Sequence, residues 1–212
     1  MWEIVHEIQL TAGTTDSLIW RWTNNGAYTV QSAYFMQFEG RTCSTLPLTF
    51  WDSDAPMKCN FFAWLACLNR CLTANNILKH GWPCDPICPL CRSCNESSLH
   101  ILLHCPFSCQ VWCLVQMKLQ ITLNPRPAAA SSLNLWWLDQ IHNKPKEAAR
   151  SMNTVINFVC WSLWKERNAR VFNNLLSPPC VVFSKVVEEA AVWLAAGKSK
   201  AGQLARRPLE PD

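Results

Sequence analysis

The sequence predicts a mainly α-helical protein with a small N-terminal β-hairpin, a helical pair, a cysteine-rich knuckle of the C2HC type and a C-terminal helical segment. Three observations support this fold class. Apolar residues recur at helical spacing over several long stretches. In one short stretch, side chains alternate between two faces on both sides of an Asn-Gly pair, as they do in β-hairpins. Another, CPLCRSCNESSLHILLHC (88–105), carries cysteines and histidines at the spacing of metal ligands.

The composition of the chain indicates a folded core. Of its 212 residues, 50% are hydrophobic, with 12 Trp and 9 Phe, so a packed core is expected and global disorder is not. The 19 basic and 15 acidic residues give a net charge of +4. That charge permits contact with nucleic acid without requiring it, because dedicated binders usually carry a denser basic face.

Several features indicate a reducing intracellular location, nucleus or cytoplasm. No apolar run approaches the roughly 18 residues that a membrane span needs, so no membrane partner is expected. The N-terminus, MWEIVHEIQL, has two glutamates and no basic region, unlike a secretory signal. The 13 cysteines are odd in number, and without an export signal we expect buried thiols and a few metal ligands. Secretion is therefore not expected.

The hairpin is predicted within LIWRWTNNGAYTV (18–30). Its side chains alternate between two faces, and Asn25 and Gly26 both tolerate the positive φ angles of a tight turn. Ser32, a residue type common at helix N-caps, then opens a short helix.

The helical pair follows. Pro56 suits the start of its first helix, in which apolar residues recur at helical spacing: Phe61, Phe62, Trp64, Leu65 and Leu68. Thr73 caps the second helix and Gly81 ends it. Beyond the cysteine-rich stretch, FSCQVWCLVQMKLQI (107–121) is predicted to form an amphipathic helix.

A linker and two more helices complete the chain. Residues 124–134, NPRPAAASSLN, have a linker composition, and amphipathic helices are predicted over 153–174 and 181–197. We therefore expect five segments: a lead-in (1–15), a domain around the knuckle (16–123), a linker with room for a short helix (124–150), a helical segment (151–197) and a disordered tail (198–212).

Cys88 and Cys91 form a CxxC pair, which serves either a zinc knuckle or a thioredoxin-like redox site. The redox interpretation requires a βαβ context and a thiol at a helix N-terminus, and neither is visible. Two sets of zinc ligands then compete. Both contain the CxxC pair and His100, and the fourth ligand is either His104 or Cys105. On an uninterrupted helix, Cys105 would lie about 140° around from His100, at about 100° per residue.

Pro106 favours Cys105 as the fourth ligand. A residue before proline is pushed out of helical geometry, so Cys105 lies at a helix exit where its sulfur can turn back. A third thiolate also suits a closed structural site better than a second imidazole. We predict one structural Zn²⁺ ion with four ligands: Cys88, Cys91, His100 and Cys105. His104 is then expected to face solvent or support the site, and Cys94 to be a free thiol.

Five motifs stand in a distinctive order along residues 16–115: DSLIWRWTNNGAYTVQSAY, FWDSDAPMKCNFFAWLACLNRCLTANNILKHGW, CPLC, HILLHCPF and VW. This order resembles the zinc-binding domain of plant non-LTR retrotransposon reverse transcriptases. The resemblance implies a helical zinc module whose ligand positions fall on the four residues predicted above. VCWSLWKERNARVFNN resembles the helix that commonly follows this domain in the same elements.

The parent polyproteins of that family carry a polymerase and often a ribonuclease H domain. This sequence has no tyrosine-x-Asp-Asp polymerase signature and no acidic cluster for two magnesium ions. Its six glycines are not clustered into a phosphate-binding loop. We therefore expect a stand-alone remnant, domesticated or decaying, that is not an enzyme and has no small-molecule substrate.

Two functions are predicted for such a module. In the first, it binds RNA or DNA through phosphate contacts with little sequence preference. The candidate contacts are Lys79, His80, Arg92, Lys118, Lys165, Arg167 and Arg170. In the second, zinc only holds the helices together, and an exposed apolar surface packs against a reverse transcriptase or another protein. A remnant without selected function is a third alternative. A continuous basic face would favour nucleic acid, and an apolar face a protein partner.

Overall fold

The computed structural model of the chain describes residues 18–36 and 51–195. The chain divides into two compact units, Met1–Thr45 and Leu46–Asp212. The predicted lead-in (1–15) and tail (198–212) lie outside the described residues. The predicted domain boundaries therefore stay predictions.

The described part of the first unit contains no β-strand, so the predicted hairpin is wrong. The Asn-Gly turn itself is present: Gly26 has a φ of 68°, and Asn25 Oδ1 accepts a hydrogen bond from the backbone N–H of Ala27 (3.1 Å). Two backbone bonds span it, from the N–H of Trp20 to the carbonyl of Gly26 (2.8 Å) and from the N–H of Gly26 to the carbonyl of Thr23 (3.1 Å). The strand that should follow is replaced by helix α2 (Val30–Met36).

A pair of reciprocal capping hydrogen bonds explains why this helix forms in place of the strand. Thr29 Oγ1 accepts a hydrogen bond from the N–H of Ser32 (3.0 Å), and Ser32 Oγ accepts one from the N–H of Thr29 (3.2 Å). Such a pair satisfies two backbone donors at once and starts a helix. Only three residues then separate Gly26 from the helix start at Val30, too few for a second strand.

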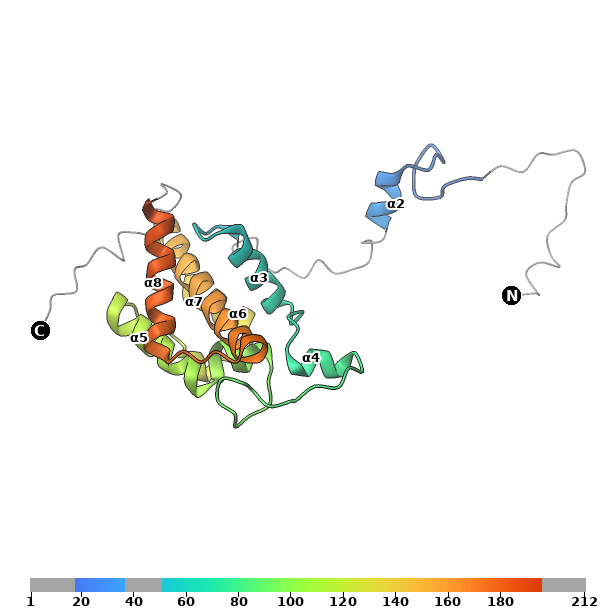
Figure 1. The fold of residues 1–212 in the computed structure, drawn as a ribbon. Helices are drawn as coiled ribbons and strands as arrows, with labels where there is room; N and C mark the ends of the chain where they lie inside the picture. Colours follow the sequence, from blue (N-terminus) through green and yellow to red (C-terminus); the bar gives the residue numbers. More distant parts are fainter. Residues whose placement is uncertain (1–17, 37–50, 196–212) are drawn as a thin grey trace, which may run out of the picture. The chain divides into compact units, whose positions relative to one another are not determined.

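The second unit is mainly helical and is built around α7 (Lys146–Asn173), a helix of 28 residues (Figure 1). Four helices contact it: α3 (Met57–Cys67), α5 (Pro106–Leu119), α6 (Leu133–Ile141) and α8 (Pro179–Ala195). The other elements are α4 (Ala74–Lys79), a π-helical turn η2 (His100–His104) and a 3-10 turn η3 (Pro127–Ala129). Within the described ranges, no helix is both long and apolar enough to cross a membrane.

Local signals place the helix starts. Pro56 is the N-cap of α3 and Thr73 the N-cap of α4, as predicted. Pro106 and Pro179 are the first residues of α5 and α8. Proline is favoured at these positions because its fixed φ suits a helix and its missing N–H would have no partner there.

A helix, α6 (Leu133–Ile141), forms within the predicted linker segment 124–150. In α6, the buried residues Leu133, Trp136, Trp137 and Ile141 recur at helical spacing. Ser132 caps the helix, since its Oγ accepts a hydrogen bond from the N–H of Leu135 (3.1 Å). The short helix for which this segment had room is thus α6.

Three tryptophans form the centre of the core. Trp112, Trp136 and Trp137 are at most 1% exposed, and the rings of Trp112 and Trp136 meet edge to face at 5.3 Å. Each indole N–H has a partner: the carbonyl of Leu102, the carbonyl of Pro125 and Asn153 Oδ1, respectively. Buried indoles need such partners. These bonds join α5 to η2 and α6 to α7, and the contact between the Trp112 and Trp136 rings joins α5 to α6.

Candidate metal centre

Four side chains converge beside α7: Cys88, Cys91, His100 and Cys105. Their ligand atoms all lie within 4.8 Å of one another. Cys88 and Cys91 come from the loop between α4 and η2, His100 is the first residue of η2, and Cys105 is the N-cap of α5. Cys88 and Cys105 are buried, and the other two are half-buried. The structure therefore brings together the four residues that the sequence singles out.

The π-helical turn explains how residues five apart reach one point. The N–H of Cys105 bonds to the carbonyl of His100 at 2.7 Å, and such an i to i+5 bond places the two residues one turn apart. Cys105 itself has φ −60° and ψ 131°, the extended geometry expected before Pro106. The predicted helix exit is present. The widened turn is a second reason why His100 and Cys105 lie close together, and the sequence did not indicate it.

A tight loop holds the two cysteines of the CxxC pair. The N–H of Arg92 bonds to the carbonyl of Cys88, and the N–H of Cys88 bonds to the carbonyl of Cys94, both at 2.8 Å. Arg92 has a φ of 54°, which reverses the chain direction. An isolated β-bridge between Ile87 and Asn95 closes the base of the loop.

The four groups are electrostatically coupled. A hydrogen bond with Cys105 raises the pKa of the Cys88 thiol, and the same bond lowers the pKa of Cys105. A hydrogen bond with Cys88 raises the pKa of the His100 imidazole. At Cys91, burial raises the thiol pKa, but hydrogen bonds, the first of them with the backbone of Ser93, outweigh burial and lower it. A bound cation would favour the thiolate form of all three cysteines.

The residues present fit one zinc ion. With Zn–S about 2.3 Å and Zn–N about 2.0–2.1 Å, a tetrahedral site places its sulfurs about 3.8 Å apart and each sulfur about 3.6 Å from the nitrogen. The 4.8 Å limit that encloses the four ligand atoms is compatible with these values, and so is the 3.3 Å contact between Cys91 Sγ and His100 Nε2. Three thiolates and one imidazole are a donor set of structural zinc sites.

The neighbouring cysteines and the second histidine have other surroundings. His104 Nε2 lies 2.8 Å from the carbonyl of Ala130, so this histidine links η2 to the segment after η3. Cys94 is an exposed free thiol. Cys84 and Cys109 donate their thiols to the carbonyls of Ala74 (3.5 Å) and Leu103 (3.2 Å).

Three of the seven basic residues predicted to contact nucleic acid have partners within the protein. Lys165 pairs with Glu189 (2.7 Å), Arg167 with Glu96 (2.8 Å) and Arg170 with Glu166 (2.9 Å). The other four, Lys79, His80, Arg92 and Lys118, are at least partly exposed. The described surface around the knuckle therefore offers fewer free cations than the sequence predicts.

Glu96 is the residue near the site that the sequence analysis missed. Its carboxylate is buried and accepts hydrogen bonds from Arg167 and from the N–H of Ala74 (3.2 Å). Nothing in the sequence links positions 96 and 167. The pairing of Glu166 with Arg170 did have a sequence signal, because opposite charges four residues apart on a helix lie on the same face.

Comparison with known proteins shows what this segment resembles. Residues 28–112, which contain all four clustered residues, match the family model described as zinc-binding in reverse transcriptase. This segment is therefore similar to zinc-binding segments of reverse transcriptases. The resemblance and the single zinc ion predicted from the sequence are thereby confirmed. The family is a zinc-binding module and not a catalytic domain.

The chain is also similar to a putative ribonuclease H protein of Arabidopsis thaliana, with 24% identity over 189 residues. The aligned region covers 87% of this chain and 30% of that relative. It therefore extends well beyond the zinc-binding segment. Both similarities are consistent with a plant sequence derived from a retrotransposon. No solved structure matches the chain.

Proposed function

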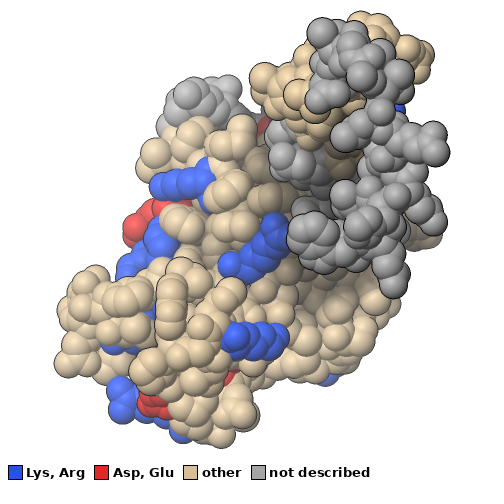
Figure 2. Space-filling model, turned by 90° about the vertical axis from the view of Figure 1, so that its right-hand side faces the viewer, with Lys and Arg blue, Asp and Glu red and all other residues tan. Residues whose placement is uncertain are grey.

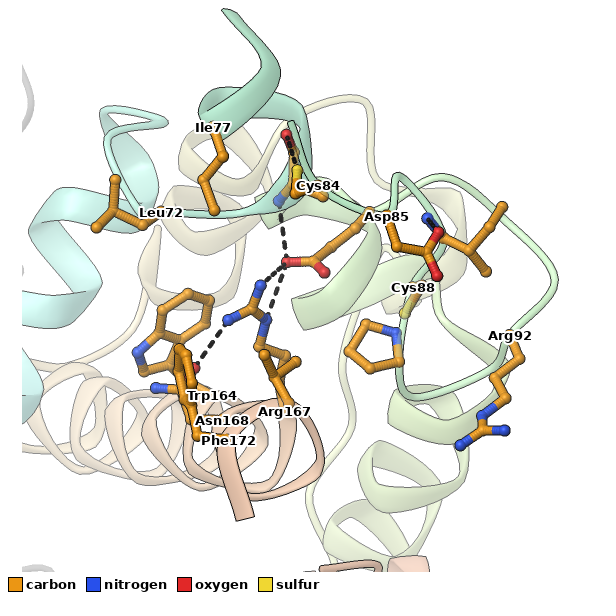
Figure 3. A pocket seen from close by; sticks show the side chains of 15 residues that line it. Leu72, Ile77, Cys84, Asp85, Cys88, Arg92, Trp164, Arg167, Asn168 and Phe172 are labelled. Atoms are coloured by element: carbon orange, nitrogen blue, oxygen red, sulfur yellow. Dashed lines mark hydrogen bonds and ion pairs between the residues drawn. The ribbon is translucent and has the colours of Figure 1, made fainter. Parts of the chain in front are cut away.

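We propose that this chain is a non-catalytic zinc module that docks a polypeptide segment in an apolar groove beside the metal centre. The groove is the main observation that supports this proposal. It is a hollow of about 840 Å³. The metal-site loop and α4 form one side of it, and the C-terminal part of α7 forms the other (Figure 3).

Apolar side chains dominate the walls of the groove. They include Leu72, Ile77, Ile87, Trp164, Val171 and Phe172. Leu72 is 57% exposed and Phe172 is 73% exposed. Figure 3 shows Leu72 and Ile77 on one side, and Trp164 and Phe172 on the other. Exposed apolar side chains that line a groove support a protein contact there.

The charges around the groove suit a polypeptide better than a nucleic acid. Arg167, the arginine of α7 in its lining, is neutralised by Glu96. The other charged residues of the lining, Asp85 and Arg92, have opposite signs. On the face drawn in Figure 2, lysines and arginines stand in separate places among uncharged and acidic residues and form no continuous band. The family description supports a reverse transcriptase as the partner.

The metal site supports a non-catalytic role. A zinc ion held by three cysteines and one histidine is four-coordinate and closed, whereas catalytic zinc keeps one position open for water or substrate. The four clustered residues fill all four positions of such a site. Zinc would therefore stabilise the loop that forms one wall of the groove.

The docking proposal predicts that Phe172→Asp weakens binding of a purified plant non-LTR reverse transcriptase by at least about tenfold, or about 1.4 kcal/mol. The reason is that a carboxylate in the apolar groove loses hydration when the partner covers it. Isothermal titration calorimetry measures the affinity. Met117→Asp is the matched control, since Met117 is 68% exposed on α5 and does not line the groove. Equal effects of the two variants, or no binding by the unmodified chain, would contradict the proposal.

Nucleic-acid binding is a second candidate, and one cluster favours it. Lys79, His80 and Trp82 are all exposed at the C-terminal end of α4. The rings of His80 and Trp82 lie 6.2 Å apart, and Trp82 is 61% exposed. An exposed indole can stack on an unpaired base, and a lysine beside it can contact phosphate.

This second candidate predicts that Trp82→Ala weakens binding of labelled single-stranded RNA by about 5- to 150-fold, from a stacking contribution of about 1–3 kcal/mol. Fluorescence anisotropy at low and moderate salt measures the binding, which should weaken as salt rises. Phe172→Asp should leave RNA binding unchanged, so the two candidates are separable. An affinity no better than that of a neutral control protein would eliminate this candidate.

A further inference from the structure

We infer that Arg170 of α7 is a positioning residue of the zinc site, although it lies outside the family match at residues 28–112. The inference does not depend on the docking proposal. It rests on the contacts of one side chain with both segments that carry the metal ligands.

Arg170 contacts the two residues that separate the cysteines of the CxxC pair. Its Nη1 donates hydrogen bonds to the carbonyls of Pro89 (3.2 Å) and Leu90 (3.0 Å). Its guanidinium also lies over the ring of Phe107, 4.5 Å from the ring centroid. Phe107 follows Cys105 by two residues. One side chain thus contacts residues beside the CxxC pair and a residue near Cys105.

The carbonyls of Pro89 and Leu90 matter because of the N–H groups that share their peptide planes. A trans peptide points its C=O and its N–H in opposite directions. The carbonyl of Pro89 shares its peptide plane with the N–H of Leu90, and the carbonyl of Leu90 shares its plane with the N–H of Cys91. Both N–H groups hydrogen-bond to the Cys88 sulfur. By holding the two carbonyls, Arg170 aims two N–H groups at a zinc ligand.

Arg170 is itself held rigidly. Its Nε donates to Glu166 Oε1 (2.9 Å), and its Nη2 donates to the carbonyl of Ser177 (3.1 Å). The same Glu166 oxygen accepts the N–H of Ser177 (2.7 Å). The side chains of Arg170 and Glu166 are 11% and 2% exposed. A planar guanidinium has several donors in a fixed arrangement. Anchoring Arg170 therefore also fixes the position of the loop carbonyls to which it donates.

The test is the zinc affinity of Arg170→Met, measured by competition with a chromophoric chelator. Groups that orient metal ligands from outside typically change metal affinity by about 10- to 100-fold when removed. We expect a loss of that size, together with a change in the visible absorption bands of the Co²⁺-substituted protein. Arg170→Lys should recover only part of the affinity, because an ammonium is a compact charge without the planar fork.

Lys165→Met is the matched control, since Lys165 lies on the same helix and pairs with Glu189 away from the site. It should bind zinc within about twofold of the unmodified chain. If Arg170→Met matches this control in zinc affinity and in its Co²⁺ spectrum, the inference is overturned. If Arg170→Met does not fold, Arg170→Lys decides, and an unchanged affinity and spectrum for that variant overturn it as well.

Discussion

Replacing Cys105 with serine is expected to reduce the metal content of the purified chain from about one zinc to nearly none. A serine hydroxyl does not replace a thiolate, and Cys105 is fully buried where the four ligand atoms meet. Zinc binding in closed structural sites contributes about 10–16 kcal/mol to folding, so the loop around residues 84–105 should unfold with the loss. Elemental analysis measures the zinc, and circular dichroism measures the loss of structure.

His104→Ala is the control for this experiment. It removes the hydrogen bond to the carbonyl of Ala130, which contributes about 0.5–1.5 kcal/mol, and it should leave the zinc content near one per chain. If His104→Ala loses zinc and Cys105→Ser keeps it, the fourth ligand is His104 and not Cys105. The pair of variants therefore tests the choice between the two ligand sets directly.

Replacing Arg167 with methionine is expected to lower the free energy of unfolding by about 3–5 kcal/mol, because it leaves the carboxylate of Glu96 buried without its cation. The Glu96 and Arg167 side chains are 2% and 6% exposed. Arg167 also lies over the ring of Trp164, 5.1 Å from the ring centroid, and methionine preserves part of that packing. Urea unfolding of the zinc-loaded protein measures the change.

Two further variants identify the cause of that loss. The double variant Glu96→Gln with Arg167→Met should recover part of the stability, since no buried charge remains unpaired. Lys165→Met breaks a more exposed pair with Glu189 and should cost less than about 1 kcal/mol. A loss at Arg167→Met no larger than that at Lys165→Met would show that the buried pair does not hold the metal-site loop to α7.

Signals confined to a few neighbouring residues explain what the sequence could predict. Pro56 and Thr73 stand at the N-caps of α3 and α4, where the sequence predicted helix starts, although the Thr73 side chain makes no capping hydrogen bond. Pro106 likewise forces Cys105 into extended geometry, which singled out the ligand set. The hairpin failed for a related reason. Its turn at Gly26 formed, but the cap of Thr29 and Ser32, equally local, started a helix where the second strand was expected.

Long-range pairing explains what the sequence could not predict. Arg167 was predicted to contact nucleic acid, and its pairing with Glu96 could not be foreseen because Glu96 lies 71 positions away in the chain. The contact of Arg170 with the carbonyl of Leu90 spans 80 positions, although its pairing with Glu166 is local. The π-helical turn between His100 and Cys105 likewise has no sequence signature. Within it, three consecutive residues, Ile101 to Leu103, are buried.

The distance along the chain between the metal-site loop and its arginines sets an order of events during synthesis. At roughly 5–20 residues per second, Arg167 follows Glu96 out of the ribosome after about 4 to 14 s. The knuckle can therefore capture its ion while α7 is still being made. We therefore expect the metal to shape the loop before α7 packs against it. The contacts between distant residues, whose formation slows folding, would then form on a loop that is already ordered.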